Sequence, residues 1–302
     1  MDNDKKIVKK IKNAIKNVRF KAEYSGREIL SEVDGNDLIY QMLAKDEPMA
    51  VMRLGATEAV CVYPWMLGKE PDEEILQRGM ILSGIFPADS EHNAEFAETY
   101  LKALYSADIM ALWDVSNEKK IVDRYCKPDV RYIRSKSIEP YYYDEPWSRI
   151  LEGRKVLIVH PFVETIKSQY ERRSRLFENP DVLPEFGSIR FVKAVQSSAG
   201  EKSEFGSWLE ALNHMKAEIE KQDFDVAIIG AGAYALPLCA HVKSLGKQAV
   251  QMSGATQILF GIKGRRWDDH PVISKLYNEY WVRPNESETP KHNEKVEGGS
   301  YW

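Results

Sequence analysis

The sequence predicts a Rossmann-like α/β fold, in which a mainly parallel sheet carries helices on both faces. Three continuous apolar runs of strand length support it, at residues 155–160 (KVLIVH), 225–230 (DVAIIG) and 248–253 (QAVQMS). Helical patterns separate the later runs, one over residues 207–221 and one that ends at Gly246. Strands without polar alternation are typical of parallel strands buried on both faces, and their alternation with helices is typical of doubly covered sheets.

The first half of the chain repeats this alternation with shorter elements. Apolar runs at residues 50–54, 107–113 and 130–133 predict buried strands, and residues 189–195 predict another strand. Residues 91–105 place apolar side chains at helical spacing behind Ser90, which is the expected N-cap. The elements therefore continue along most of the chain.

The domain organisation that we expect has three parts. A basic amphipathic helix occupies residues 1–21, a single Rossmann-like domain occupies residues 22–284, and a polar tail over residues 285–302 wraps the surface. The Pro- and Tyr-rich stretch near 140–150 is the expected hinge. The tail ends in Tyr301 and Trp302, and two terminal aromatic residues indicate docking against the body.

Composition excludes several classes of protein. The chain has 302 residues, is 43% hydrophobic and carries a net charge of −4, which argues against a general nucleic-acid binder. Its three cysteines lie far apart and match no zinc spacing, so we expect reduced thiols that pack as small hydrophobic side chains. No apolar run approaches the length of a membrane span and no signal peptide is visible, so we expect a cytoplasmic protein.

The basic segment at residues 5–21 has two interpretations. Its lysines and arginine surround an apolar stripe at helical spacing. Such a helix docks its stripe on the body or on a second subunit, or it makes a peripheral contact with an anionic membrane at the inner face of the cell.

A glycine loop follows the strand at residues 225–230. Gly230 and Gly232 allow a ligand to approach the backbone, and a helix that begins near Tyr234 offers unpaired amide groups to a phosphate. The spacing also fits a dinucleotide fingerprint, but the next strand ends at Gln251 without the acid that holds a ribose. The missing acid also weakens a methyltransferase interpretation. Phosphate binding and a purely structural glycine turn remain as alternatives.

The next strand end carries Ser253, Gly254 and Gln257, which we expect beside the glycine loop because parallel strands end at one edge of the sheet. Downstream, Arg265 and Arg266 precede Trp267. Arginine pairs with diphosphate oxygens and tryptophan stacks on flat rings, although a solvated basic turn has the same composition.

Arg53, Gly55 and Glu58 follow the first strand of the chain. An arginine and a glutamate around a glycine turn are able to hold a phosphate and to activate a hydroxyl group. An ordinary ion pair at the strand end is the alternative.

With these motifs, residues 45–270 resemble the GT-D-type glycosyltransferases, which are Rossmann-like transferases of bacterial surface-glycan pathways. That family carries an Arg-x-Gly-Asp-x-Glu stretch near its N-terminus and a late strand, glycine loop and helix. Arg53, Gly55 and Glu58 match the first element, and the loop from Gly230 to Leu236 matches the second in outline. The resemblance implies a hexosyltransferase-like enzyme of polysaccharide biosynthesis that uses a nucleotide-sugar donor.

The sequence departs from this family at Ala56, which replaces the aspartate of the Asp-x-Glu pair. The resemblance implies Mn²⁺ or Mg²⁺ as the cofactor, but these ions prefer several oxygen ligands and Glu58 alone supplies too few. A metal-independent transferase, in which arginines and a helix N-terminus neutralise the leaving diphosphate, is the alternative.

Five other polar residues follow strands or lie in loops where an acceptor or a supporting residue would be expected. They are His160, Glu164, Lys167, Ser197 and Glu201. His160 lies at the end of an apolar strand. The charged helical run that contains Lys167 is also typical of a helix face exposed to solvent. Hydrolase elbows, Walker loops and zinc-protease motifs are absent from the sequence.

The function that these features favour is transfer of a sugar from a nucleoside-diphosphate donor of the UDP type to a hydroxyl of a glycan acceptor, which is either free or lipid-linked. Glu58 is the expected catalytic base. Arg53, Gly55, the glycine loop, the Ser253 loop and Arg265 or Arg266 are the expected donor site. The alternatives are a non-catalytic nucleotide-sugar or glycan-binding partner of the same pathway and a nicotinamide-dependent oxidoreductase.

Overall fold

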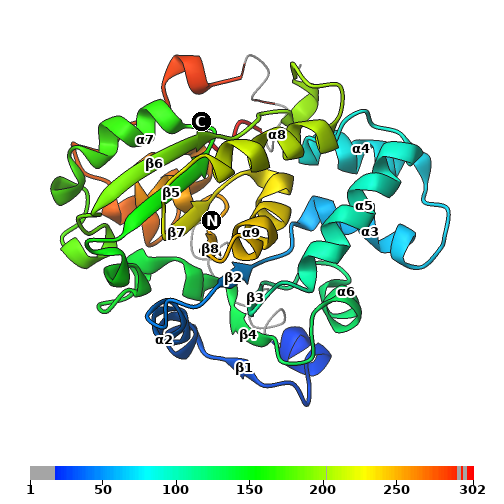
Figure 1. Ribbon diagram of the computed structural model, residues 1–302, viewed down its shortest axis with the longest axis horizontal. Coiled ribbons are helices and arrows are strands. Elements are labelled where there is room, and N and C mark those ends of the chain that lie inside the picture. Colours follow the sequence, from blue (N-terminus) through cyan, green and yellow to red (C-terminus); the bar gives the residue numbers. More distant parts are fainter. Residues whose placement is uncertain (1–17, 202, 291–293, 295–297) are drawn as a thin grey trace, which may run out of the picture.

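A computed structural model describes residues 18–201, 203–290, 294 and 298–302. Its eight strands form one sheet in the order β1-β4-β3-β2-β8-β7-β5-β6, and every pairing is parallel. The strands are β1 (Ile29–Leu30), β2 (Met49–Met52), β3 (Ile109–Leu112), β4 (Arg131–Arg134), β5 (Lys155–His160), β6 (Ser188–Lys193), β7 (Val226–Ile229) and β8 (Gln248–Gln251). Figure 1 shows the sheet running from β6 at the upper left to β1 at the bottom.

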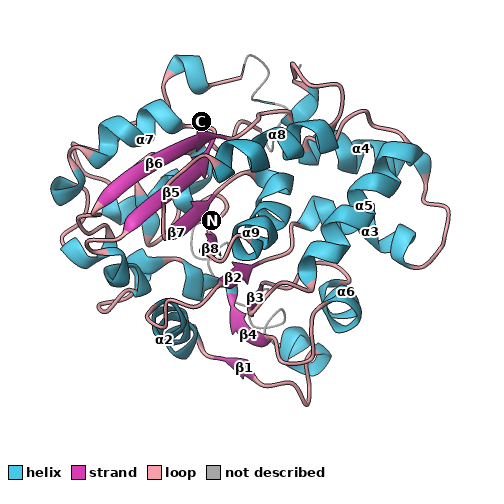
Figure 2. Ribbon diagram, in the orientation of Figure 1, coloured by secondary structure: helices cyan, strands magenta, loops and turns pink. Residues whose placement is uncertain are grey.

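Helices cover both faces of this sheet, as Figure 2 shows. They are α2 (Glu32–Leu43), α3 (Ala56–Met66), α4 (Glu73–Ser83), α5 (Ser90–Leu104), α6 (Glu118–Tyr125), α7 (Val163–Tyr170), α8 (Trp208–Glu220), α9 (Ala235–Ser244), α10 (Ala255–Leu259) and α11 (Arg265–Asp268). The sequence-based prediction of a Rossmann-like fold with a mainly parallel sheet is confirmed.

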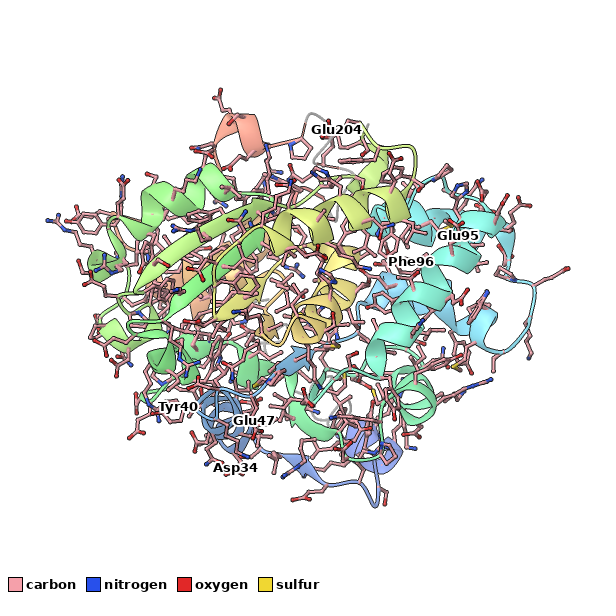
Figure 3. The ribbon with its side chains drawn as sticks, viewed as in Figure 1. Asp34, Tyr40, Glu47, Glu95, Phe96 and Glu204 are labelled. Carbon is pink, nitrogen blue, oxygen red and sulfur yellow. The ribbon has the colours of Figure 1, made fainter. Side chains whose placement is uncertain are left out.

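Two hydrophobic cores lie on opposite faces because successive residues of a strand point to opposite sides. In β5, Leu157 and Val159 join the core under α3, α4, α5, α6, α8 and α9, whereas Val156 and Ile158 join the core under α2, α7 and α10. Phe96 and Tyr40, which are labelled in Figure 3, belong to the first and second of these faces. Each fully buried large apolar side chain contributes about 1.5–3 kcal/mol.

Most predicted strands agree with the observed ones to within two residues, but one predicted cap is wrong. The N-cap of α5 is Asp89, whose carboxylate accepts the His92 N–H at 2.9 Å, and Ser90 is the first helical residue. Ser207 caps α8 by accepting the Glu210 N–H at 3.2 Å.

Of the basic segment at residues 5–21, the structure describes only residues 18–21. These belong to a helical stretch over residues 18–23. The described part of the tail contacts the body: the Tyr301 carbonyl accepts a hydrogen bond from Gln257, and the Trp302 ring lies 6.1 Å from that of Phe162. No helix within the described ranges is long and apolar enough to span a membrane. The domain boundaries and the hinge near 140–150 remain predictions.

Candidate functional site

The chain leaves β2 and β8 toward opposite faces of the sheet, although the two strands are parallel neighbours. After β2 it enters α3, whose Ala59 and Val62 belong to the first core, and after β8 it enters α10, whose Ile258 and Leu259 belong to the second. Open α/β sheets bind their ligands outside the carboxyl ends of two such strands, and we call this place the switch point.

Arg53 lies at this switch point, as the first residue after β2. Its backbone N–H donates to the Gln251 side-chain oxygen at 3.0 Å, which joins the ends of β2 and β8. Its guanidinium carbon lies 4.5 Å from the centre of the Trp113 ring. Within the described part of the chain, the Arg53 guanidinium forms no ion pair and no hydrogen bond. Its planar set of donors is therefore available to an anionic ligand.

Trp113, at the end of β3, is itself held from two sides. Its indole N–H donates to the Leu54 carbonyl at 2.8 Å, and its backbone N–H donates to Glu118 at 3.3 Å. The Glu118 carboxylate also accepts the Asp114 N–H and the Tyr24 hydroxyl, both at 3.0 Å. Glu118 thus fixes the turn that presents the tryptophan face to Arg53.

The Glu118 side chain is 1% exposed, and burial raises its pKa to about 7 although its hydrogen bonds favour the charged form. The folded protein holds the Glu118 proton more tightly than the unfolded chain does. This tighter binding contributes fully to the free energy of unfolding below pH 4.5, and the contribution is lost as the pH rises to about 7.

We therefore expect the unfolding free energy of the wild type to fall relative to Glu118→Gln between pH 4.5 and pH 7, by at most about 3 kcal/mol. Denaturant unfolding at several pH values measures this difference. Glu95, labelled in Figure 3, is exposed on α5, so Glu95→Gln is the control and its difference from the wild type should not change over this range. A difference in unfolding free energy between the wild type and Glu118→Gln that did not change with pH would contradict the raised pKa.

Gly55 and Glu58 form a compact turn at the start of α3. The Gly55 N–H donates to the Tyr100 hydroxyl at 3.2 Å, and the Glu58 carboxylate folds back so closely over Gly55 that a Cβ there would clash with it. Glu58 is 8% exposed and accepts the Thr57 hydroxyl at 3.1 Å. Only a glycine at position 55 permits this carboxylate position.

The two glycines of the loop after β7 have different surroundings. Gly230 is buried, its N–H donates to the Val159 carbonyl at 2.9 Å, and a Cβ would meet His160, Ser253 and Thr256. Gly232 is exposed in the left-handed region at φ +54, with open space where a Cβ would lie. Gly232 is therefore the position at which a ligand would reach the backbone, and Gly230 brings the two strand-end loops together.

Tyr234 and Ser197 are brought together in the interior rather than at the surface. Their hydroxyls lie 3.0 Å apart, the Ser197 hydroxyl also donates to the Gly84 carbonyl at 2.7 Å, and the Tyr234 ring stacks on Trp208. Both side chains are at most 4% exposed. In this arrangement they support the loop from beneath.

His160 is buried next to the glycine loop. Its Nδ1 accepts the Phe162 N–H at 3.0 Å, and burial lowers its pKa to about 3. The ring is therefore neutral at physiological pH.

The loop after β8 lies against the C-terminal residues. Ser253 has a left-handed backbone with φ 52, and a Cβ at Gly254 would approach Tyr301 and Trp267. Gln257 is 1% exposed and donates to the carbonyls of Lys263 and Tyr301. Its side-chain amide group is occupied within the protein.

The remaining residues predicted for the site lie on other elements. Arg265 and Arg266 are exposed on α11, and the Arg266 guanidinium carbon lies 4.8 Å from the Tyr301 ring centre. Glu164 and Lys167 pair with each other on α7 at 2.9 Å. Glu201 lines a cavity of about 380 Å³ next to Ser197. Their roles remain predictions.

Sequence reasoning missed Trp113, Glu118 and Gln251 as parts of the site. The signal for Trp113 and Gln251 was present, because each stands at the end of an expected parallel strand. Glu118 had no such signal, since it reaches the site from the start of α6 through hydrogen bonds to backbone groups.

The side chains at the Arg53–Glu58 turn do not fit a protein-bound divalent metal. Ala56 is exposed and supplies no ligand, and Glu58 is the turn's one carboxylate. Across the described residues, no group of three or more His, Cys, Asp and Glu side chains is placed to hold a metal ion. Divalent cations take six or more oxygen ligands, which this donor set does not provide.

The all-parallel sheet and the switch point between β2 and β8 define a Rossmann-like α/β domain. The model of the GT-D-like family, a GT-D fold-like domain, matches residues 31–259, and the chain belongs to this family. No curated protein matches the chain.

Two solved structures are similar. One, described as a highly conserved domain of unknown function 1792 with a distinct glycosyltransferase fold, is 14% identical over 86% of this chain and 92% of that chain, with a TM-score of 0.49. The other, a selenomethionine-substituted domain of unknown function 1792, is 13% identical over 76% of this chain and 78% of that chain, with a TM-score of 0.48.

Proposed function

We propose that the protein transfers a sugar from a nucleoside-diphosphate donor of the UDP type to a hydroxyl of a glycan acceptor, free or lipid-linked. The observation that carries the proposal is the Arg53 guanidinium, which Trp113 holds at the switch point without a carboxylate partner among the described residues. Membership of the GT-D-like family supports a sugar donor as the ligand.

In the proposed reaction, the acceptor oxygen forms a bond to the anomeric carbon of the donor. The bond from that carbon to the diphosphate oxygen breaks, and the nucleoside diphosphate leaves with the electron pair. Glu58 takes the proton of the acceptor hydroxyl. Arg53 and the backbone at Gly232, at the entrance to α9, stabilise the charge of the leaving diphosphate.

The residue at the end of β8, Gln251, argues against the oxidoreductase alternative. It occupies the end of β8, where a dinucleotide site needs an acid for the ribose, and its side-chain oxygen is already used by the Arg53 N–H. The non-catalytic alternative rests on Ala56, which leaves Glu58 without the paired carboxylate of the family motif. Slow hydrolysis of the donor by the wild type would distinguish an enzyme from a binding partner.

Calorimetric titration of the intact protein with UDP tests the donor site and its metal dependence. We expect UDP to bind in EDTA, and Mn²⁺ to change its affinity by less than about threefold, because Arg53 and backbone amides supply the charge. The variant Ala56→Asp places a second carboxylate in the exposed first turn of α3, so we expect Mn²⁺ to raise its UDP affinity at least about tenfold.

Ala56→Asn is the matched control, since it has the same size without the charge, and Mn²⁺ should not affect its affinity. Absence of UDP binding in both EDTA and Mn²⁺ would contradict the donor assignment. Binding by the wild type in Mn²⁺ alone would contradict the metal-independent mechanism.

A further inference from the structure

A cavity of about 570 Å³ lies beside the carboxyl ends of β1 and β4. The helical residues 18–23, the turn that follows them, β1 and the start of α2 form its wall together with Arg134. The residues that line it are Phe20, Lys21, Tyr24, Ser25, Gly26, Arg27, Ile29, Leu30, Ser31, Glu32 and Arg134. Its lining does not include Arg53, and it lies near the same edge of the sheet.

One part of this wall is apolar. Phe20 and Tyr24 are about 5% exposed or less, and their ring centres lie 4.6 Å apart. Ile29 and Leu30 are half-buried beside them. Phe20 and Tyr24 are thus the packed base of this part of the wall. The partly exposed side chains of Ile29 and Leu30 offer a hydrocarbon chain a surface that removes it from water.

A neighbouring part of the wall is cationic. The Arg134 guanidinium carbon lies 3.9 Å above the Phe20 ring, and neither Arg134 nor Lys21 has a carboxylate partner within the described ranges. By contrast, Arg27 is paired with Asp123, and Glu32 is paired with Lys136 at 3.0 Å. Two uncompensated cations therefore stand next to apolar side chains, which is the charge pattern that suits an amphiphilic anion.

A chain of contacts connects this cavity to the Arg53 site. The Tyr24 hydroxyl donates to Glu118, which holds Trp113 against Arg53. A second link is electrostatic. Lys136 binds Glu32, and the charges of Lys136 and Arg53 both lower the pKa of Glu139, against the larger effect of its burial, which raises it. The cavity is therefore linked to the Arg53 site through residues of the protein itself.

We propose that this cavity binds the phosphate-bearing, apolar anchor of a lipid-linked acceptor. The hydrocarbon chain lies along Ile29 and Leu30, and the phosphate is bound by Arg134 and Lys21. The identification of this ligand as the acceptor rests on the proposed transferase function, whereas the ligand class rests on the cavity alone.

Calorimetric titration of the intact protein with octyl phosphate tests the ligand class. We expect octyl phosphate to bind at least about tenfold more tightly than 1-octanol or inorganic phosphate, because the cavity offers both an apolar and a cationic surface. Arg134→Gln and Lys21→Gln should each weaken octyl phosphate binding, by about tenfold for Arg134→Gln. Lys21 is exposed, so we expect its replacement to test the cavity without destabilising the fold.

Arg131→Gln is the matched control. Arg131 is exposed at the opposite end of β4, so its replacement removes the same charge from the same strand and should leave octyl phosphate binding unchanged. Equal binding by wild type, Arg134→Gln and Lys21→Gln would overturn the proposal, as would equal affinities for octyl phosphate and octanol.

A titration with UDP of protein saturated with octyl phosphate separates this inference from the proposed function. Simultaneous binding supports the acceptor assignment, whereas mutual exclusion would make the cavity part of the donor site and overturn it. Arg134-dependent binding of octyl phosphate by a protein that binds no UDP would contradict the transferase and the acceptor assignment, but it would support the ligand class.

Discussion

Replacement of Glu58 by glutamine is expected to lower the rate of sugar transfer by about 10²–10⁴-fold, the usual contribution of a positioned general base. The amide keeps the shape of the side chain but does not accept the proton of the acceptor hydroxyl. Because Glu58 is not placed on the donor diphosphate, the affinity for UDP should change by less than about threefold. Single-turnover transfer and calorimetry on the same variant measure the two quantities.

Glu73→Gln is the control for this experiment, since Glu73 is an exposed carboxylate in the first turn of the neighbouring helix α4. Its transfer rate should equal that of the wild type. A Glu58→Gln variant with an undiminished rate would remove Glu58 from the mechanism. Asp114 would then be the next base to test, because it follows β3 at the same edge and has a left-handed backbone with φ 68.

Replacement of Arg53 by alanine is expected to lower transfer by about 10²–10³-fold and to weaken UDP binding as well. The guanidinium lies at the switch point next to the Trp113 ring, so the substitution removes a positive charge together with its set of donors. Arg53→Lys should recover part of the UDP affinity, since it restores a point charge without the planar donor set. Calorimetry with UDP and a transfer assay measure these effects.

Arg190→Ala serves as the control for Arg53, because Arg190 is an exposed arginine on the far edge strand β6. It should bind UDP as the wild type does. If Arg53→Ala bound UDP with undiminished affinity, the diphosphate would have to lie elsewhere, and Gly232 with the start of α9 would be the remaining part of the proposed donor site.

The pattern of apolar runs determined the fold class and most strands of the sheet. Residues 155–160 form β5 as expected, because a run without polar alternation is stable only where both faces of the strand are buried. β1 was not predicted. It has two half-buried residues, so it carries too short a pattern to be distinguished from a loop. Asp89 was overlooked as a cap because Asp89 and Ser90 are both good caps and only the backbone conformation separates them.

The sequence also identified the residue types at the switch point, since Arg53, Ser253 and the two loop glycines all lie at or just after the ends of expected strands. What only the tertiary structure decided is which of these atoms a ligand can reach. Gly230 is packed against His160 and Ser253 while Gly232 is open, and Gln257 is occupied by the C-terminal residues. The residues that hold Arg53 in place come from β3, α6 and β8, because contacts between distant segments arise from packing and not from spacing along the chain.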